Sequence, residues 1–247
     1  MLKQRKSLAA AAVLATLVVL YGWLHWRAAA VTAAGPRQSV EDRIVDIDRQ
    51  TRMDPVVITK ITVGNRQIQP GQSLGAREDK PGTPFQADED WLKTMTIAVK
   101  NRSDLIIVRA EIRLYFPDTG DGTLSRPVTA YTITLGQVPE MNSFTSRGQR
   151  ILPDNSKQPL LLAPGQTLVI RIADYLDDIR SSLEEKLPLS RVTRVSIDRL
   201  RFFFADGLRW KNLDGFALPD PNHPGQYRSP DPAFFPGRSS QNWPPDE

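Results

Sequence analysis

Apolar and polar side chains alternate between Ile106 and Phe116, and this alternation constrains the fold more than any other feature of the sequence. Successive side chains of a β-strand point to opposite faces, so a period of two indicates a strand with one buried and one wet face. Such a strand is typical of an antiparallel sheet. The buried face is expected to carry Ile106, Val108, Ala110, Ile112, Leu114 and Phe116, and the wet face Arg109, Glu111, Arg113 and Tyr115.

Further segments carry the same period and are expected to form strands. Turn-forming residues separate these segments at intervals of about 8–12 residues, which is typical of a β-sandwich. The fold class expected for residues 55–218 is therefore mainly β: an immunoglobulin-like antiparallel β-sandwich with one helix inserted in a connection. The further strands are expected at 56–63, 91–100, 131–135, 168–172 and 192–204.

Two local signals refine the last part of this pattern. The apolar residues of 192–204 change from odd to even positions, and a β-bulge near Asp198 and Arg199 would account for the change. The pair Asp206-Gly207 that follows is a strong signal for a two-residue hairpin turn. A bulged strand that leads into a hairpin is therefore expected here.

Two other segments carry helical spacing. Residues 174–187 place apolar side chains four apart and end before Pro188, which predicts the inserted amphipathic helix. Ser39 and Asp42 resemble a capping box, and apolar residues follow them at helical spacing. A short helix is therefore expected within a linker over residues 27–54.

An uncharged apolar run precedes this linker and predicts a membrane anchor over residues 8–26. A helix rises about 1.5 Å per residue, so a segment of this length reaches across most of the ~30 Å hydrocarbon core of a bilayer. Because basic residues precede the run, the positive-inside rule keeps residues 1–7 in the cytoplasm and exports the rest. The anchor is expected to include Leu8, Leu14, Leu17, Leu20, Trp23 and Trp26, and the topology to depend on Lys3, Arg5 and Lys6.

The same run has a second interpretation as a cleaved secretory signal. Ala28-Ala29-Ala30 offers the small residues that signal peptidase accepts. The run is longer than the usual apolar region of about 7–15 residues, which favours a retained anchor. The expected location is the inner or cytoplasmic membrane, with a single span and a periplasmic or extracellular domain; if residues 1–30 are cleaved, the protein is secreted.

Charge and cysteine content exclude several classes of function. Four of the 32 basic residues lie before residue 28, whereas the first of the 28 acidic residues is Glu41, so the exported part is formally neutral. A neutral domain lacks the positive field that phosphate-backbone binding needs, and no nucleic-acid partner is expected. The chain has no cysteine, which excludes disulfides and thiolate metal sites.

Few residues carry recognisable chemistry, and no catalytic residue, cofactor or metal is expected. The two histidines are His25, beside the anchor, and His223, in the tail, which leaves little for a catalytic triad or a zinc site. Asp118-Thr119-Gly120 matches the triplet of aspartic peptidases, but those enzymes need two carboxylates, and the surrounding turn formers favour a loop. Asp118 and Asp121 are weak calcium candidates, because they supply only part of the about 6–8 oxygens that calcium takes.

The C-terminal segment 219–247 differs in composition from the rest of the chain, because it contains 8 of the 20 prolines. Proline has no backbone donor and favours extended conformations. The tail is therefore expected to be extended or disordered. Its aromatic residues leave open the alternative that it packs against the sandwich.

Several motifs follow the anchor in order: DWLKTMTIAVKN, the strand end Ile112-x-Leu114-x-Phe116-Pro117, LAPGQT, VTRVSID, and FFADGLRW followed by PDPNHPG. In these motifs the chain resembles a group of uncharacterised bacterial anchored or exported proteins with an immunoglobulin-like domain. The resemblance covers roughly residues 56–232, and the last motif is its most specific part. It implies a fold and a location, and it implies no reaction.

The expected function is that of a membrane-anchored extracytoplasmic binding module with no evident catalytic activity. It would contact the bilayer through its N-terminal helix and bind an envelope protein, a peptide or a glycan through its sandwich. Two alternatives stay open: a carboxylate-dependent hydrolase that uses Asp118, and a calcium-stabilised structural protein of the envelope. The sequence leaves the oligomeric state open.

Overall fold

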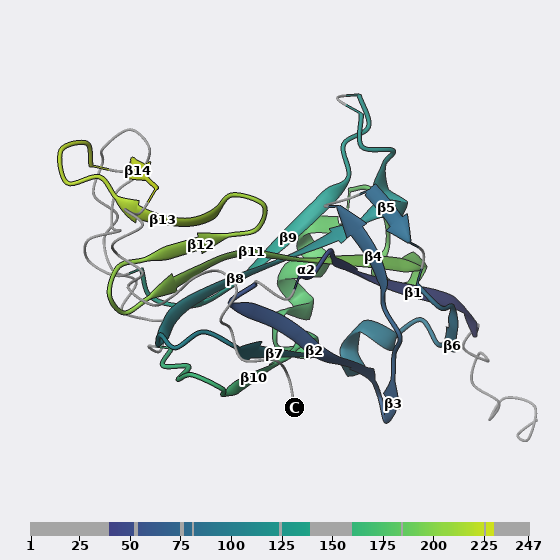
Figure 1. Ribbon diagram of the computed structural model, residues 1–247. Helices are drawn as coiled ribbons and strands as arrows, with labels where there is room; N and C mark the ends of the chain where they lie inside the picture. The colour runs from purple at the N-terminus through teal and green to yellow at the C-terminus, as the bar shows by residue number, and fades with distance from the viewer. Residues whose placement is uncertain are drawn as a thin grey trace, which may run out of the picture. The chain divides into compact units, whose positions relative to one another are not determined.

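The computed structural model of the chain describes residues 40–51, 54–74, 77–80, 82–123, 125–138, 160–183, 185–224 and 226–229 (Figure 1). The predicted anchor, its topology residues and His25 lie outside these ranges, as does the part of the tail from residue 230 onward. Within the described ranges, no helix is long and apolar enough to span a bilayer.

The fold is mainly β, as predicted, and consists of a ten-stranded and a four-stranded sheet. The strands are β1 (Glu41–Asp48), β2 (Val56–Val63), β3 (Arg66–Gln67), β4 (Gly71–Leu74), β5 (Arg77–Lys80), β6 (Phe85–Ala87), β7 (Met95–Asn101), β8 (Ile107–Phe116), β9 (Thr129–Gly136), β10 (Thr167–Arg171), β11 (Arg194–Phe204), β12 (Arg209–Lys211), β13 (Gly215–Pro219) and β14 (Tyr227–Arg228). The helical segments are η1 (Trp91–Thr94), η2 (Pro117–Thr119), η4 (Ile172–Tyr175), α2 (Leu176–Leu183) and η5 (Leu189–Arg191).

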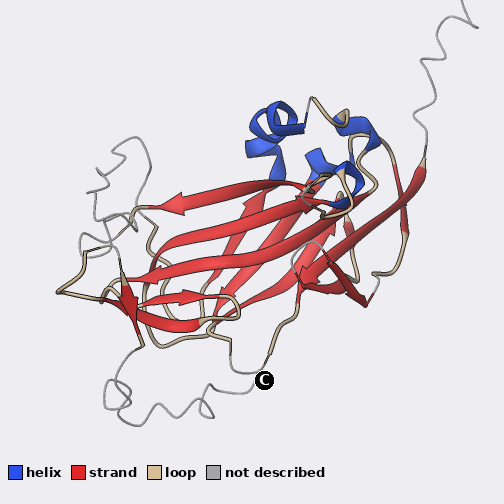
Figure 2. Ribbon diagram, turned by 90° about the horizontal axis from the view of Figure 1, so that it is seen from above, coloured by secondary structure: helices blue, strands red, loops and turns tan. Residues whose placement is uncertain are grey.

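The four-stranded sheet has the order β10-β7-β2-β3, and the ten-stranded sheet has the order β14-β13-β12-β11-β1-β4-β5. In the larger sheet β6 also pairs with β1. Strand β8 pairs with β11 on one side and with β9 on the other. The smaller sheet lies beneath the larger one in Figure 1, and Figure 2 shows the helical segments gathered at one side of the strands. Apolar side chains of both sheets form one buried cluster, which includes Ile97, Val99, Ile112, Leu114 and Ile197.

The strand predictions in the second half of the chain are confirmed with small changes in their bounds. The register of β11 against β8 shifts between Asp198 and Arg201, so the bulge predicted near Asp198 and Arg199 is present. Asp206 and Gly207 lie in the hairpin connection from β11 to β12, as predicted, but this connection covers residues 205–208 and is longer than the predicted two-residue turn. Gly207 has a φ of 86°, a left-handed conformation that glycine adopts without steric cost.

The inserted helix is present but shorter than the predicted range 174–187. The 3-10 segment η4 ends at Tyr175, and α2 follows it directly. Ile179 and Leu183 are the buried residues of α2 and lie one turn apart, so the helix presents one apolar stripe to the core. The hydroxyl of Tyr131 on β9 donates a hydrogen bond of 3.0 Å to Asp178 of α2, which ties the helix to the edge of the larger sheet.

This tie predicts a loss of stability at alkaline pH. Burial, and then the hydrogen bond to Asp178, raise the pKa of Tyr131 from 10.0 to about 12. Because the pKa of the folded state lies above that of the unfolded state, the contribution of Tyr131 to stability is present below pH 10 and is lost as the pH rises towards 12. A pH series of urea unfolding should show this loss in the native chain and a smaller one in Tyr131→Phe; identical profiles would contradict the assignment.

The helix predicted after Ser39 is wrong, because residues Glu41–Asp48 form the strand β1. Ile44, Val45 and Ile47 are β-branched, and their spacing fits a strand as well as a helix. The neighbouring strands decide the outcome, since β1 lies between β11 and β4 and pairs in parallel with both. The predicted linker therefore contributes a central strand of the larger sheet, and these two parallel pairings depart from the purely antiparallel sheet that the sequence predicts.

The first part of the proline-rich tail packs on the sheet. Strand β14 is extended, as predicted, and pairs with β13 so that Tyr227 lies opposite Pro219. The guanidinium carbon of Arg209 on β12 lies 3.4 Å from the centre of the Tyr227 ring. For residues 226–229, the alternative in which the tail docks against the sheet is therefore the observed one.

Candidate functional site

Asp118, which lies in the strongest candidate catalytic motif of the sequence, connects two segments of the chain through hydrogen bonds. Its carboxylate accepts hydrogen bonds from the amide of Thr193 at 2.6 Å and from the amide of Arg194 at 3.0 Å. The hydroxyl of Thr193 donates to the same carboxylate at 3.0 Å. The loop that carries Asp118 is thereby held against the start of β11, and both carboxylate oxygens are engaged.

Asp121, the second calcium candidate, has a local role in the same loop. Its Oδ1 accepts a hydrogen bond of 3.0 Å from the amide of Thr123, and the hydrogen bonds to Thr123 lower the pKa of Asp121. No group of three or more histidine, aspartate or glutamate side chains among the described residues could hold a metal ion. The described residues therefore offer no assembled calcium site around Asp118 and Asp121.

The contacts of Asp118 predict a modest structural effect of its removal. Asp118→Ala should lower the free energy of unfolding by about 1–2 kcal/mol, because two backbone amides and a hydroxyl lose a charged acceptor. Urea unfolding of the full chain measures this effect, with Asp177→Ala as a control on the exposed surface of α2. If Asp118→Ala left stability unchanged and abolished a hydrolytic activity, the alternative function as a hydrolase would be favoured instead.

His223 also lies in a local pair. Its Nδ1 lies 2.8 Å from Oδ2 of Asp220, and the side chain of His223 is 62% exposed. The hydrogen bond with His223 lowers the pKa of Asp220. The two residues are three apart in a turn, so the pair stabilises the start of the tail.

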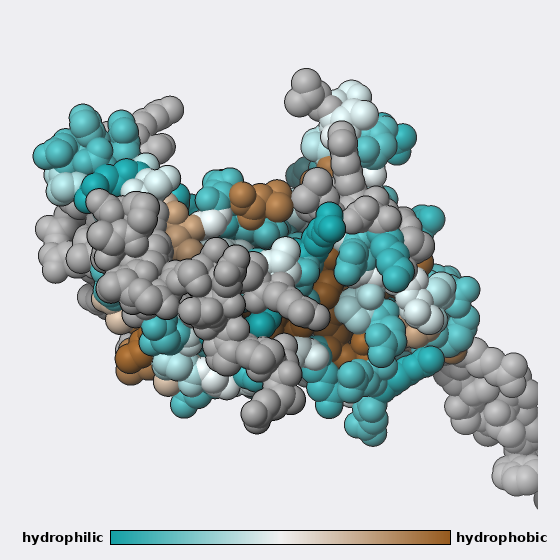
Figure 3. Space-filling model, in the orientation of Figure 1, coloured by the Kyte–Doolittle hydropathy of each residue, from teal (hydrophilic) through white to brown (hydrophobic). Residues whose placement is uncertain are grey.

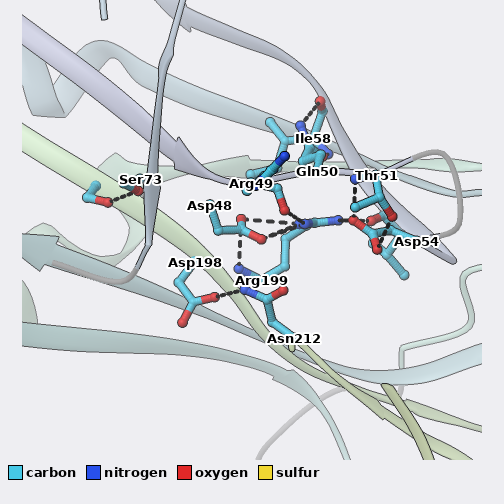
Figure 4. Close-up of polar contacts among 12 residues, drawn as sticks. Asp48, Arg49, Gln50, Thr51, Asp54, Ile58, Ser73, Asp198, Arg199 and Asn212 are labelled. Atoms are coloured by element: carbon cyan, nitrogen blue, oxygen red, sulfur yellow. Dashed lines mark hydrogen bonds and ion pairs between the residues drawn. The ribbon is translucent and has the colours of Figure 1, made fainter. Parts of the chain in front are cut away.

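Arg199 is fully buried at the bulge of β11 and joins four segments of the chain (Figure 4). Its guanidinium carbon lies 5.4 Å from the centre of the Trp210 ring. The guanidinium donates to Asp48, Asp54 and the backbone oxygens of Arg49 and Val56. Because each guanidinium nitrogen has a protein acceptor, we assign Arg199 to the structure of the fold and not to a binding site.

A different polar arrangement lies on the outer face of the larger sheet, the face opposite the core. Phe202 of β11 and Trp210 of β12 are buried in the core, so the residues on either side of them along each strand point outward. The same holds for β8, where Ala110 is buried in the core. We call four outward residues of these strands the cationic cluster: Arg109, Arg201, Arg209 and Lys211.

The register of the three strands arranges this face in two rows. Residues directly opposite each other on neighbouring strands have Cβ atoms about 4.5–5.5 Å apart, so members of a row are in contact range. The rows are two residues apart along each strand. The first row is Arg109, Phe203 and Arg209, and the second row is Glu111, Arg201 and Lys211.

Glu111 is the buried carboxylate within the cationic cluster. The Nε of Arg109 donates a hydrogen bond of 2.9 Å to its Oε1, and Nη2 forms an ion pair with the same oxygen at 2.8 Å. The Nε of Arg201 donates a hydrogen bond of 2.7 Å to its Oε2, and Nη2 forms an ion pair with that oxygen, also at 2.7 Å. Charge-assisted hydrogen bonds of this kind are about twice as strong as neutral ones. One carboxylate thus holds two guanidinium groups on the outer face.

Arg209 occupies the other end of its row and has a different environment. Its Nε is buried without a hydrogen-bond partner among the described residues. Burial, together with the nearby positive charge of Arg201, lowers the pKa of Arg209. Its main neighbour is the ring of Tyr227, which accepts a cation on its face. Arg209 is therefore the cation of the cluster that is least compensated by the described part of the chain.

The surface around the cluster combines polar and apolar residues. In Figure 3 hydrophilic residues cover two raised parts of the surface, at the β8–β9 connection and at the β13–β14 end, and hydrophobic residues are visible in the dip between them. Leu213, in the turn between β12 and β13, is 75% exposed. The ring of Phe203 lies under Arg109, whose guanidinium carbon is 5.9 Å from the ring centre, and only 3% of Phe203 is exposed. The cluster therefore rests on an apolar base.

The sequence pattern places Arg109 and Glu111 on the wet face of a strand but does not single them out. A signal for the rest exists in the hairpin, where Arg209 and Lys211 flank the core residue Trp210. That pattern predicts two cations on one face. It does not predict that Arg201 joins them, because the bulge in β11 sets which residues of that strand point outward.

Comparison of the chain with protein-family models, with curated proteins and with solved structures finds no match in any of the three. The resemblance to anchored or exported bacterial proteins therefore stays a prediction.

Proposed function

We propose that this chain is a membrane-anchored, extracytoplasmic binding module of immunoglobulin-like type, and that the outer face of its larger sheet is the binding surface. The cationic cluster is the observation that carries this proposal. The partner is a component of the cell envelope, and the chain acts by binding it and not by catalysis.

Electrostatic repulsion within the cluster supports a binding role. Arg201 lies directly opposite Lys211, and like charges in opposed positions of a sheet are destabilising. The carboxylate of Glu111 compensates Arg109 and Arg201, and Asp214 lies 2.6 Å from Lys211. Arg209 keeps a half-buried charge, and an anionic group from outside would relieve the repulsion.

The contacts of the candidate acid support the absence of catalysis. A general acid or base must reach a proton of its substrate. The carboxylate of Asp118 instead accepts hydrogen bonds from two backbone amides and the Thr193 hydroxyl. These contacts fit a structural role of the aspartate better than a catalytic one.

The proposed location of the chain in the membrane is inferred from the sequence. The uncharged run over 8–26 and the three basic residues before it support a single span with the N-terminus in the cytoplasm. The binding surface would then face the periplasm or the exterior, where an envelope protein, a peptide or a glycan can reach it.

Photo-crosslinking in cells tests the proposed surface. A benzoylphenylalanine at Ala217, which lies opposite Arg209 on the outer face, should capture an envelope component. The same probe at Lys60, on the exposed side of the smaller sheet, is the positional control. Capture at Ala217 that disappears in the Arg209→Ala background supports the proposal. Equal capture at both positions, or none at Ala217, overturns it.

A further inference from the structure

We infer that the outer face binds an extended acidic segment of a partner protein, whose aspartate or glutamate side chains pair with Arg209 and Lys211. This inference rests on the proposed function and adds the chemical class of the ligand. It depends on the positive charge that the carboxylates beside the cluster leave uncompensated, on the spacing of its two rows and on the open space beside them.

The cations of the cluster differ in how closely carboxylates of the chain compensate them. Arg109 and Arg201 each donate a hydrogen bond from Nε to Glu111 and form an ion pair with it through Nη2. Glu111 thus shows how a carboxylate sits on this face. The guanidinium of Arg209 is half-buried and packs on the ring of Tyr227, and its Nε is buried out of reach of an external ligand. The ammonium group of Lys211 pairs with Asp214, and the Lys211 side chain is 39% exposed. Arg209 and Lys211 are therefore the groups that an external carboxylate would meet.

The spacing of the rows favours an extended peptide. Arg209 and Lys211 are two residues apart on β12, and a strand rises about 3.3 Å per residue, so their rows lie ~6.6 Å apart. Alternate side chains of an extended peptide have the same separation. Two carboxylates at positions i and i+2 of such a peptide can therefore meet both cations together.

Small residues beside the cluster leave room for the peptide. Ala217 lies opposite Arg209 on β13, and Gly215 lies opposite Lys211. A Cβ atom added at Gly215 would meet nothing within 4 Å, so the space next to Lys211 is open. The peptide backbone can approach β12 and β13 here without displacing a large side chain.

The amount of charge limits the ligand. The four cations of the cluster lie beside the carboxylates of Glu111 and Asp214, which leaves the cluster with an excess of two positive charges. A ligand with two carboxylates matches that excess. A nucleic acid or an anionic bilayer presents a long array of phosphates and is favoured by a larger basic patch.

Fluorescence anisotropy with the full-length chain in a non-ionic detergent tests the inference. The probe is a labelled peptide of about ten residues that alternates glutamate with threonine, and the matched control replaces every glutamate by glutamine. The acidic peptide should bind, the glutamine peptide should not, and raising the salt from about 0.05 M to about 0.5 M should weaken binding because the cluster is partly exposed.

Substitutions in the cluster locate the binding. Arg209→Ala should raise Kd about tenfold, and Lys211→Gln about threefold, since each removes one charge-assisted contact. Arg180→Ala, which removes an exposed arginine of α2, should leave Kd unchanged. Thermal unfolding of each variant checks the fold. The Lys211→Gln variant changes a partly exposed side chain and keeps the test decisive if Arg209→Ala unfolds.

The inference would be overturned if the glutamine peptide bound as tightly as the acidic peptide, or if Kd were unchanged in both cluster variants. It would also be overturned if oligogalacturonate or dioctanoyl phosphatidylglycerol competed for the site more strongly than the unlabelled peptide does. The crosslinking experiment separates this failure from that of the proposed function. Capture at Ala217 that depends on Arg209, without binding of the acidic peptide, retains the surface and rejects the ligand class. Failure of both experiments rejects the surface itself.

Discussion

Replacing Arg199 by leucine is expected to lower the free energy of unfolding by about 3–5 kcal/mol, the usual effect of removing one partner from a buried ion pair. Asp48 is 1% exposed, and its two oxygens accept from the Arg199 side chain. Without the guanidinium, this carboxylate stays buried without its counter-charge. The backbone oxygens of Arg49 and Val56 lose their donors as well.

Urea unfolding of the full chain measures the effect of Arg199→Leu. The matched control is Arg171→Leu, which removes an ion pair with Asp174 whose side chains are 69% and 49% exposed, and this control should cost less than about 1 kcal/mol. The double variant Arg199→Leu/Asp48→Leu should recover much of the loss, because apolar groups can replace a buried pair at little cost. Equal losses in Arg199→Leu and Arg171→Leu would contradict the assignment.

Replacing Gly136 by alanine is expected to cost about 3 kcal/mol or more, from two causes that add. Gly136 has a φ of 72°, and a left-handed conformation costs a residue with a Cβ about 1–2 kcal/mol. An added Cβ would also collide with the carbonyl oxygen of Val108 and lie 2.6 Å from the Cβ of Leu160. The Val108 oxygen belongs to the backbone of β8, so it cannot move aside as a side chain could.

The chain contains a matched control for this effect. Gly165 has nearly the same φ, 75°, and a Cβ added there would meet nothing within 4 Å. Gly165→Ala should therefore cost only about 1–2 kcal/mol, the conformational part alone. The difference between the two variants in urea unfolding measures the collision. Equal losses would show that β9 can shift away from β8 at this end.

The strands that the sequence predicts correctly are those whose alternation comes from their own side chains. In β8 the apolar residues Ala110, Ile112 and Leu114 are buried, and Arg113 between them is only partly so. A period of two predicts these positions, because one face of the strand meets the core. The prediction is wrong for Ile106, which is 42% exposed while Ile107 is buried, and for Glu111, which the pattern places on the wet face and which is 2% exposed.

Strand β1 is the clearest failure, and its reason is physical. Charged residues occupy buried positions in it, including Arg43, Asp46 and Asp48, so its hydropathy does not resemble that of a central strand. These charges are tolerated because distant residues pair with them, as when Arg194 donates to Asp46 at 2.6 Å. A pattern within residues 41–48 cannot contain that information.

In the candidate site, too, local motifs are visible in the sequence, whereas contacts between distant residues are not. The motif at Asp118 is visible in the sequence, but its partners Thr193 and Arg194 lie 75 and 76 residues away and give the carboxylate a structural role. The cationic cluster is the reverse case, since no motif marks it and Arg201 lies 90 residues from Glu111.

Local chemistry was therefore enough to establish a mainly β chain, the position of its bulge, its hairpin and its inserted helix, because each depends on neighbours within a few residues. The tertiary structure alone decided that β1 lies in the larger sheet and that β8, β11 and β12 bring the cationic cluster together. Those outcomes depend on strand register between distant segments, and register is set by packing across the whole core.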